Sequence, residues 1–238
     1  MSRAFIVAGA SSHSGKTLVT LGLIAALRAR GLTVAAAKCG PDYIDPSFLE
    51  AASGKPAINL DTWAMAPEIL AARAARQAEG ADIVIVEGVM GLYDGGPGGA
   101  GSTASLAAAL GLPVMLVIPA SGLAQSAAAI AEGFARLAEG FVVAGAIVNQ
   151  IASDRHESLI REGFARASVP LLGTIRRDPS IAIASRHLGL IQAEEHADLA
   201  KKIARAGALI AEGCDLDAIL KIASLEVPSA SLPPVGRG

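Results

Sequence analysis

The stretch AFIVAGASSHSGKT, residues 4–17, decides the fold of this chain. An apolar run over residues 5–8 ends in Gly9, and a loop of small polar residues then leads to Gly15, Lys16 and Thr17. Leucine and isoleucine follow at helical spacing up to residue 27. A strand, a glycine-bounded loop and a helix in this order form the setting of a phosphate-binding P-loop.

The chemistry of such a loop follows from its small residues, which allow backbone N–H groups to turn inward around a phosphate. The amino end of the following helix adds partial positive charge. We expect Lys16 to reach the β- and γ-phosphates of ATP and the Thr17 hydroxyl to hold Mg²⁺. The residues expected to bind ATP in this loop are Gly9, Ser11, Ser12, His13, Ser14, Gly15, Lys16 and Thr17. A glycine–serine turn that only happens to precede Lys-Thr is the alternative.

The composition limits the class of protein. The chain has 238 residues, 52% of them hydrophobic and only 3% aromatic, so its core must be built from Ala, Val, Ile and Leu. A net charge of −2 gives no general attraction to nucleic acid or to an anionic membrane. Cys39 and Cys214 lack the spacing of a disulfide framework or a zinc site. Without a signal peptide or a bilayer-spanning apolar stretch, we expect a cytoplasmic protein.

A second strand is expected over residues 33–38, and the loop CGPDYIDPSF, residues 39–48, follows it. The prolines prevent regular structure there. The carboxyl end of a parallel strand lies near the P-loop, so this loop belongs to the expected site. The polar residues at this strand end are Lys38, Asp42, Tyr43 and Asp45. The alternative is an Asx turn that caps a helix beginning near Pro46.

A buried strand is also expected in DIVIVEGVMG, residues 82–91, where an apolar run ends in Glu87. A carboxylate at that place is the Walker B arrangement, which holds Mg²⁺ directly or through water. A solvated loop glutamate is the alternative. We therefore expect Thr17, Asp45 and Glu87 at the metal, and Lys16, Asp45 and Glu87 as the catalytic residues.

The rest of the chain continues the alternation of strands and helices, which predicts an α/β fold with a doubly wound, mostly parallel sheet. Residues 92–102, LYDGGPGGAGS, predict a mobile loop that either closes over a substrate or only connects two elements. Trp63, the only tryptophan, is expected to anchor the core. The Pro/Ser/Gly-rich residues 226–238 are typical of a linker.

Several motifs together resemble one family, the amino-terminal synthase domain of cobyrinic and hydrogenobyrinic acid a,c-diamide synthases. The resemblance runs from about residue 3 to 195 and rests on GASSHSGKT, KCGPDYIDPSF, EGVMGLYDG, VNQ, RRDPS and SRHLGL. It implies a P-loop NTPase of the dethiobiotin synthetase/MinD-like type. In that family, ATP and Mg²⁺ drive amidation of the a and c side-chain carboxylates of a corrin ring, a small-molecule polycarboxylate. Ammonia comes from glutamine in a carboxy-terminal glutaminase domain.

The resemblance also implies roles for particular residues. Asn149 matches an adenine-reading asparagine of related P-loop proteins, because its amide offers both a donor and an acceptor, although a plain turn asparagine is the alternative. The residues expected to contact the substrate or its intermediate are Lys38, Asp42, Tyr43, Arg186 and His187. A surface pair is the alternative for Arg186 and His187. A substrate carboxylate is already ionised near pH 7, so positioning and charge neutralisation must carry catalysis.

The chain departs from the family pattern in one large respect, because no glutaminase domain with a nucleophilic cysteine is recognisable. We expect a synthase domain over residues 1–225, a linker over residues 226–238, and a glutaminase that is either cut away or a separate subunit. Leu49-Glu50 stands where relatives often carry a histidine. A dethiobiotin synthetase-like ligase, a ParA/MinD-like ATPase switch and a nucleotide-binding scaffold are the rival interpretations. Ser11, where the ParA/MinD group has a lysine, disfavours the switch. The oligomeric state stays open, a homodimer included.

Overall fold

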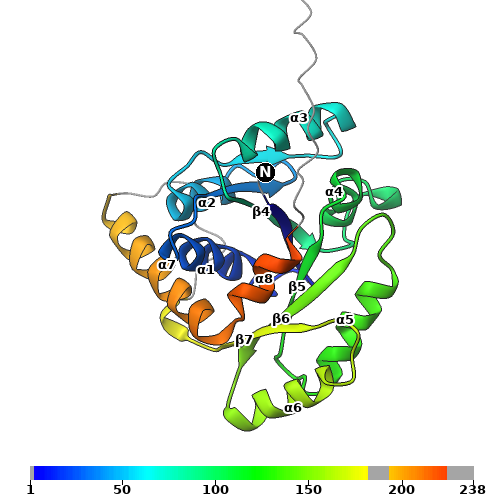
Figure 1. Cartoon of the computed structure of the whole chain (residues 1–238), viewed down its shortest axis with the longest axis vertical. Coiled ribbons are helices and arrows are strands. Elements are labelled where there is room, and N and C mark those ends of the chain that lie inside the picture. The colour runs from blue at the N-terminus through cyan, green and yellow to red at the C-terminus, as the bar shows by residue number, and fades with distance from the viewer. Residues whose placement is uncertain (1–2, 182–192, 224–238) are drawn as a thin grey trace, which may run out of the picture.

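The computed structural model describes residues 3–181 and 193–223, and it contains one seven-stranded sheet with helices on both faces (Figure 1). The strand order is β3-β2-β4-β1-β5-β6-β7, and every neighbouring pair is parallel. The strands are β1 (Arg3–Gly9), β2 (Val34–Cys39), β3 (Ile58–Leu60), β4 (Ile83–Gly91), β5 (Val114–Pro119), β6 (Val143–Ile151) and β7 (Leu171–Arg176).

The helices follow the strands in alternation, which confirms the predicted doubly wound α/β fold. They are α1 (Lys16–Ala29), α2 (Asp45–Ser53), α3 (Pro67–Ala78), α4 (Thr103–Leu110), α5 (Ser126–Arg136), α6 (Asp154–Phe164), α7 (Ala193–Gly213) and α8 (Leu216–Ile222). Two short 3₁₀ turns, η1 (Pro97–Gly99) and η2 (Pro179–Ile181), complete the described part.

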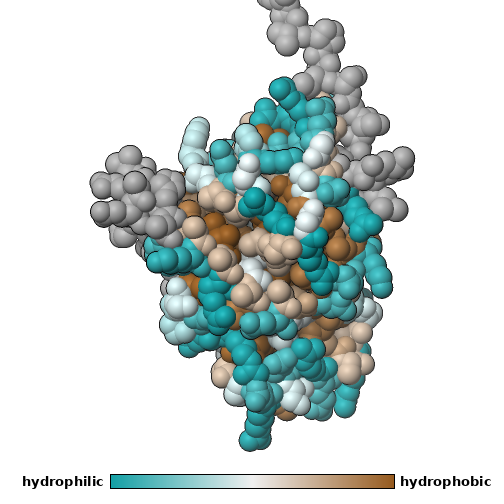
Figure 2. Space-filling model, turned by 60° about the vertical axis from the view of Figure 1, so that its left-hand side comes forward, coloured by the Kyte–Doolittle hydropathy of each residue, from teal (hydrophilic) through white to brown (hydrophobic). Residues whose placement is uncertain are grey.

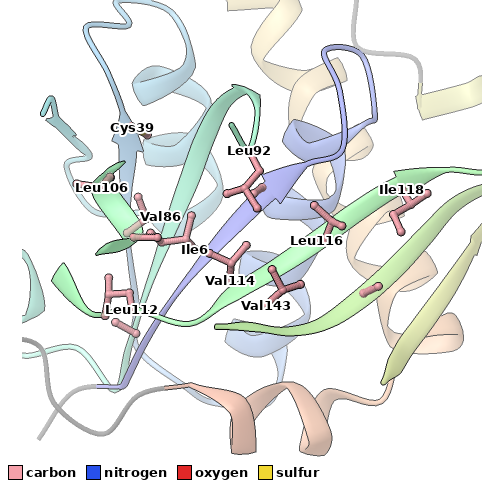
Figure 3. Close-up of a cluster of buried hydrophobic side chains, with 14 of the residues drawn as sticks. Ile6, Cys39, Val86, Leu92, Leu106, Leu112, Val114, Leu116, Ile118 and Val143 are labelled. Carbon is pink, nitrogen blue, oxygen red and sulfur yellow. The ribbon is translucent and has the colours of Figure 1, made fainter. Parts of the chain in front are cut away.

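The sheet separates two aliphatic cores, because successive side chains of a strand point to opposite faces. In β1, Phe5 and Val7 pack against the face covered by α1, α2 and α7, while Ile6 and Ala8 pack against α3, α4, α5 and α6. Figure 3 shows part of the second cluster, with Ile6 among side chains of β4, β5 and α4. The fully buried strand residues explain the continuous apolar runs in the sequence.

Strand β1 lies at the centre of the sheet and fixes the place of the site. The chain builds β2, β3 and β4 on one side of β1 and then β5, β6 and β7 on the other. The connections after β1 and after its neighbours therefore diverge, which leaves a crevice at the carboxyl end of β1. The loop of residues 10–15 lies at that crevice.

Several local expectations were wrong. Strand β4 does not end at Glu87 but continues to Gly91, because its backbone stays paired with β1 up to Gly9 after a register shift. Trp63 is 67% exposed and does not anchor the core. By contrast, residues 92–102 do form a loop, as expected, and it contains internal hydrogen bonds such as Gly96 N to Ala100 O at 2.8 Å; its mobility stays a prediction. The short edge strand β3 was not predicted.

The surface of the molecule mixes hydrophilic and apolar residues. Figure 2 shows this mixture after the molecule is turned so that the left-hand side of Figure 1, where α2 and α7 lie, comes forward. Within residues 3–181 and 193–223, no helix combines the length and apolarity needed to span a bilayer.

Candidate active site

The loop between β1 and α1 is anchored on both strands that flank β1. Ala10 N donates to Val117 O of β5 at 2.9 Å, and Leu92 N, just after β4, donates to Gly9 O at 2.8 Å. Residues 11–13 are exposed, whereas Ser14 is fully buried. The two ends of the loop are therefore held by the sheet, while its middle residues are accessible to solvent.

Two glycines of this loop are required by space. A Cβ on Gly9 would lie 2.4 Å from Ser14 Oγ, and one on Gly15 would lie 2.1 Å from Asn149 Nδ2. Gly15 also has a left-handed φ of 87° and precedes the first turn of α1, where no side chain caps the helix. The backbone N–H groups of that turn can therefore donate hydrogen bonds to an anion, as the P-loop prediction requires.

Glu87 connects this loop to the neighbouring strands. It is fully buried in β4, where it pairs in register with Val7 of β1 and Lys38 of β2. The Thr17 hydroxyl donates to Glu87 Oε1 at 2.6 Å, and Lys38 Nζ donates to the same oxygen at 3.2 Å. The two predicted metal ligands Thr17 and Glu87 thus lie together.

Asp45 joins the same group through an ion pair. Its Oδ2 lies 2.5 Å from Lys38 Nζ, at the first residue of α2. Burial alone would lower the pKa of Lys38, but the carboxylates of Glu87 and Asp45 outweigh it, so the pKa of this ammonium is raised. Burial raises the pKa of Glu87, and the Lys38 ammonium opposes that rise. The cluster places one ammonium beside two carboxylates at the edge of an apolar sheet.

Lys16 and Ser14 supply further polar atoms on the loop side. Burial, followed by repulsion from the Lys38 ammonium, lowers the pKa of Lys16. Ser14 Oγ is buried and has no hydrogen-bond partner within the described residues. Buried polar atoms without partners are costly in a folded protein, and at such a site they are typical of atoms reserved for a ligand.

The site fits Mg²⁺ held together with phosphates. Glu87 Oε2 is buried and has no partner among the described residues, which leaves a carboxylate oxygen for a cation. Within the same residues there is no cluster of three or more His, Cys, Asp and Glu side chains that could hold a metal alone. Mg²⁺ commonly binds through one or two carboxylates and completes its shell with water and substrate phosphates. Thr17, Glu87 and Asp45 match that mode.

Asp42 and Tyr43 occupy the loop after β2, as predicted, but with different surroundings. Asp42 Oδ1 accepts the backbone N–H groups of Ile44 at 2.8 Å and Asp45 at 2.9 Å, so it caps the first turn of α2. Tyr43 is 94% exposed. The Asx-turn interpretation therefore describes Asp42 in this structure, while Tyr43 is accessible to a substrate.

Asn149 lies beside the P-loop and is only 4% exposed. Its Nδ2 donates to Ser14 O at 3.2 Å, and its Oδ1 accepts the N–H of Gln150 at 2.8 Å. The side chain thus supports the loop in this structure. Adenine reading by Asn149 stays a prediction.

Backbone strain gathers at the same edge of the sheet. Within the described residues, the non-glycine residues with positive φ are His13 in the loop, Met90 near the end of β4 and Gln150 near the end of β6. Strained conformations persist only where the surroundings hold them, and they are enriched at functional sites. Their location agrees with the predicted site.

Residues 5–191 match the family model described as CobQ/CobB/MinD/ParA nucleotide binding domain. The chain belongs to this family.

Curated relatives in the family are named hydrogenobyrinate a,c-diamide synthase. The protein from Rhizobium meliloti is 48% identical over 98% of this chain and 55% of its own length. That from Brucella ovis is 44% identical over 92% of this chain and 51% of its own length. The chain spans about half the length of the curated relatives it matches.

Solved structures support the fold. Chloroplast FtsY from Physcomitrella patens matches with a TM-score of 0.57 at 16% identity, over 85% of this chain and 65% of FtsY. The septum site-determining protein MinD from Pyrococcus horikoshii, complexed with Mg-ADP, matches with a TM-score of 0.53 at 18% identity, over 87% of this chain and 95% of MinD. The predicted P-loop NTPase fold of MinD-like type is therefore confirmed.

Some supporting residues of this family site were not predicted from the sequence. Thr103 Oγ1 accepts the N–H of Val89 at 2.9 Å and Asp94 Oδ2 accepts the N–H of Gly91 at 2.9 Å, so both hold the end of β4. Arg186 and His187 lie outside the described residues. A groove of about 510 Å³ between α5 and α6 is lined by none of the predicted site residues.

Proposed function

We propose that the chain is the synthase part of a hydrogenobyrinate or cobyrinate a,c-diamide synthase. It uses ATP and Mg²⁺ to convert the a and c side-chain carboxylates of the corrinoid acid into amides. The observation that carries this proposal is the 2.6 Å hydrogen bond from Thr17 to Glu87, whose second carboxylate oxygen has no partner among the described residues. The names of relatives at 44–48% identity supply the substrate class.

The roles of the chain's own groups follow from their positions. The amides of the P-loop and Lys16 hold the phosphates, while Thr17, Glu87 and Asp45 hold the metal. When bound, Mg²⁺ neutralises charge on the phosphates that a substrate carboxylate must approach. Lys16, Asp45 and Glu87 are accordingly the catalytic residues of this proposal.

The proposed chemistry has two steps and needs no protein base. A substrate carboxylate oxygen attacks the γ-phosphorus of ATP, and ADP leaves with the electrons of the broken P–O bond. Ammonia then attacks the acyl phosphate carbon, phosphate leaves, and the nitrogen loses its extra proton to water or phosphate. The first step brings two anions together, so the chain's cationic and amide groups provide most of the catalysis.

The remaining assignments extend the proposal. Residues 1–225 form the synthase domain and residues 226–238 a linker, and ammonia is delivered by a glutaminase domain or subunit. Substrate contacts come from Lys38, Asp42, Tyr43, Arg186 and His187, and Asn149 reads adenine. We place the reaction in the cytoplasm, without nucleic-acid or membrane partners, and propose a homodimer.

The test is mass spectrometry of hydrogenobyrinic and cobyrinic acids after incubation with the chain, ATP, Mg²⁺ and an ammonium salt. We expect replacement of one and then two carboxyl groups by amides, with release of ADP. Lys55→Ala, which alters a half-buried lysine that donates to Gly80 O away from the site, is the matched active control for Lys16→Ala. The absence of any amide from both acids refutes the substrate assignment. ADP formation only with a diaminononanoate and CO₂ would assign dethiobiotin-type chemistry instead.

A further inference from the structure

The ammonium group of Lys38 is satisfied entirely by the site itself. Its side chain is 2% exposed, and Nζ lies 2.5 Å from Asp45 Oδ2, 3.1 Å from Gly88 O and 3.2 Å from Glu87 Oε1. A lysine ammonium has three N–H donors, and here each of them has an acceptor. No donor is left over for a substrate in this arrangement, so the substrate contact proposed above for Lys38 requires that one of these three contacts breaks.

Two of these acceptors are carboxylates that bind Mg²⁺ under the proposed function, on which this inference rests. Glu87 uses one oxygen, Oε1, for both Thr17 and Lys38, while its Oε2 has no partner among the described residues. Asp45 is the more accessible of the two acids, with 23% of its side chain exposed. The ammonium of Lys38 therefore already pairs with both acids before any metal ion binds.

We propose that Lys38 is a positioning residue, an internal counter-ion that holds Asp45 and Glu87 together before the nucleotide arrives and competes with Mg²⁺ for them. Two ionised carboxylates repel each other in a poorly solvated site unless a cation lies near both or one of them takes up a proton. The ammonium supplies that cation in the nucleotide-free chain. A bound Mg²⁺ would be held by the same two carboxylates that Lys38 already contacts.

This arrangement sets the order in which the ligands bind. In the nucleotide-free site, the ammonium groups of Lys38 and Lys16 balance the two carboxylates, so no net negative charge is left to attract a divalent cation on its own. The phosphates of ATP add negative charge to the site, and this charge attracts the divalent cation. We therefore expect the wild-type chain to bind divalent cations well only together with a nucleotide.

The test measures Mn²⁺ binding to the nucleotide-free chain by electron paramagnetic resonance, together with thermal unfolding in EDTA and in Mn²⁺. Lys38→Met keeps the length of the side chain and removes its charge. We expect Mn²⁺ affinity without nucleotide to rise on the order of tenfold or more, because a close like charge is removed from a poorly solvated site. We also expect Mn²⁺ to raise the melting temperature of Lys38→Met but not that of the wild type.

Control variants separate this role from a general effect of lysine removal. Lys55→Met removes the ammonium of a half-buried lysine that donates to Gly80 O and has no part in the site, and it should behave like the wild type. Lys38→Met combined with Asp45→Asn removes one carboxylate as well, and its Mn²⁺ affinity should fall back toward the wild-type value. A merely structural lysine would produce neither the metal rescue nor this reversal.

The outcomes that overturn the proposal are specific. It is wrong if folded Lys38→Met binds Mn²⁺ no more tightly than the wild type. If Lys38→Met does not fold in EDTA, it must fold in Mn²⁺, and failure in both conditions also overturns the proposal. No corrinoid is needed in these measurements, so a failed amidation assay with positive Mn²⁺ results would refute only the proposed substrate.

Discussion

Gly15→Ala tests whether the P-loop is held by direct contact with Asn149. The added Cβ would lie 2.1 Å from Asn149 Nδ2, at a residue whose φ is 87°. Gly31 provides a matched control, because its φ is 86° and nothing lies within 4 Å of its added Cβ. The two substitutions therefore share the backbone strain and differ in the clash.

These contacts set the expected loss of unfolding free energy in each variant. A left-handed alanine costs roughly 1–2 kcal/mol, less the ~0.4–1 kcal/mol gained by restricting the unfolded chain, so we expect about 1 kcal/mol for Gly31→Ala. Gly15→Ala also displaces a buried amide, which loses a hydrogen bond worth about 1 kcal/mol and adds crowding of roughly 1–3 kcal/mol. The free energy of unfolding should thus fall by about 2–4 kcal/mol more in Gly15→Ala than in Gly31→Ala.

Urea unfolding measures this difference, and thermal unfolding should separate the two variants by roughly 4–16 °C for a chain of this size. Adding Asn149→Ala to Gly15→Ala removes the clash, so the double variant should be less destabilised than the sum of the single variants. Equal costs for Gly15→Ala and Gly31→Ala would refute the reasoning from contact. Strict additivity in the double variant would do the same.

Three further predictions concern charge and burial. Lys16→Ala should abolish ATP-dependent amidation, and substantial turnover retained with ammonium salts would contradict its phosphate role. Glu87→Gln should weaken ATP binding about tenfold or more in Mg²⁺ (~1.4 kcal/mol or more) and leave binding in EDTA unchanged, as measured by calorimetry; an equal loss in both conditions would argue against a metal role. Burial raises the pKa of Cys39 to about 11 and that of Cys214 to about 12, whereas an unfolded thiol ionises near ~8.5. The unfolded state loses its protons first, so the stability contributed by the neutral thiols is complete below about pH 8.5 and is lost as the pH rises toward 11. Cys39→Ala should flatten this decline in urea titrations, and rapid reaction of the Cys39 thiol itself with iodoacetamide near pH ~8 would contradict its burial.

The fold was predictable because its strands are buried on both faces. Such strands appear in the sequence as continuous apolar runs, and the helices between them keep their own period. The end of β4 was predicted wrongly for the same reason, since the apolar run stops at Glu87 while the backbone pairing with β1 continues to Gly91. The pattern of apolar residues indicates which part of a strand is buried, whereas the length of the strand depends on how far its backbone pairs with the neighbouring strand.

The candidate site was only partly predictable. Glu87 and Lys38 were singled out separately, but their contact depends on the register between β2 and β4, which links residues 49 positions apart. One signal was available, because each residue follows a run of small or apolar residues in its strand and parallel strands end at the same edge. Trp63 was misjudged because composition favours a buried tryptophan, whereas its backbone N–H is held by Asp61 in a tight turn after β3.

The polar site exists in the folded chain because small residues surround it and its charges balance. A Cβ on Gly88 would lie 2.7 Å from Thr103 Oγ1 and 3.0 Å from Val7 O, so only glycine allows β4 to approach its neighbours directly after Glu87. A fully buried carboxylate is costly unless it is paired and hydrogen-bonded, and Lys38 and Thr17 provide both before any ligand binds. Because Glu87 keeps one oxygen without a partner among the described residues, the nucleotide-free chain remains incompletely satisfied at the point where a metal would bind. The contacts of Glu87 with Lys38 and Thr17 therefore reduce the cost of burying this carboxylate, and its second oxygen can still gain a contact when the nucleotide and its cation bind.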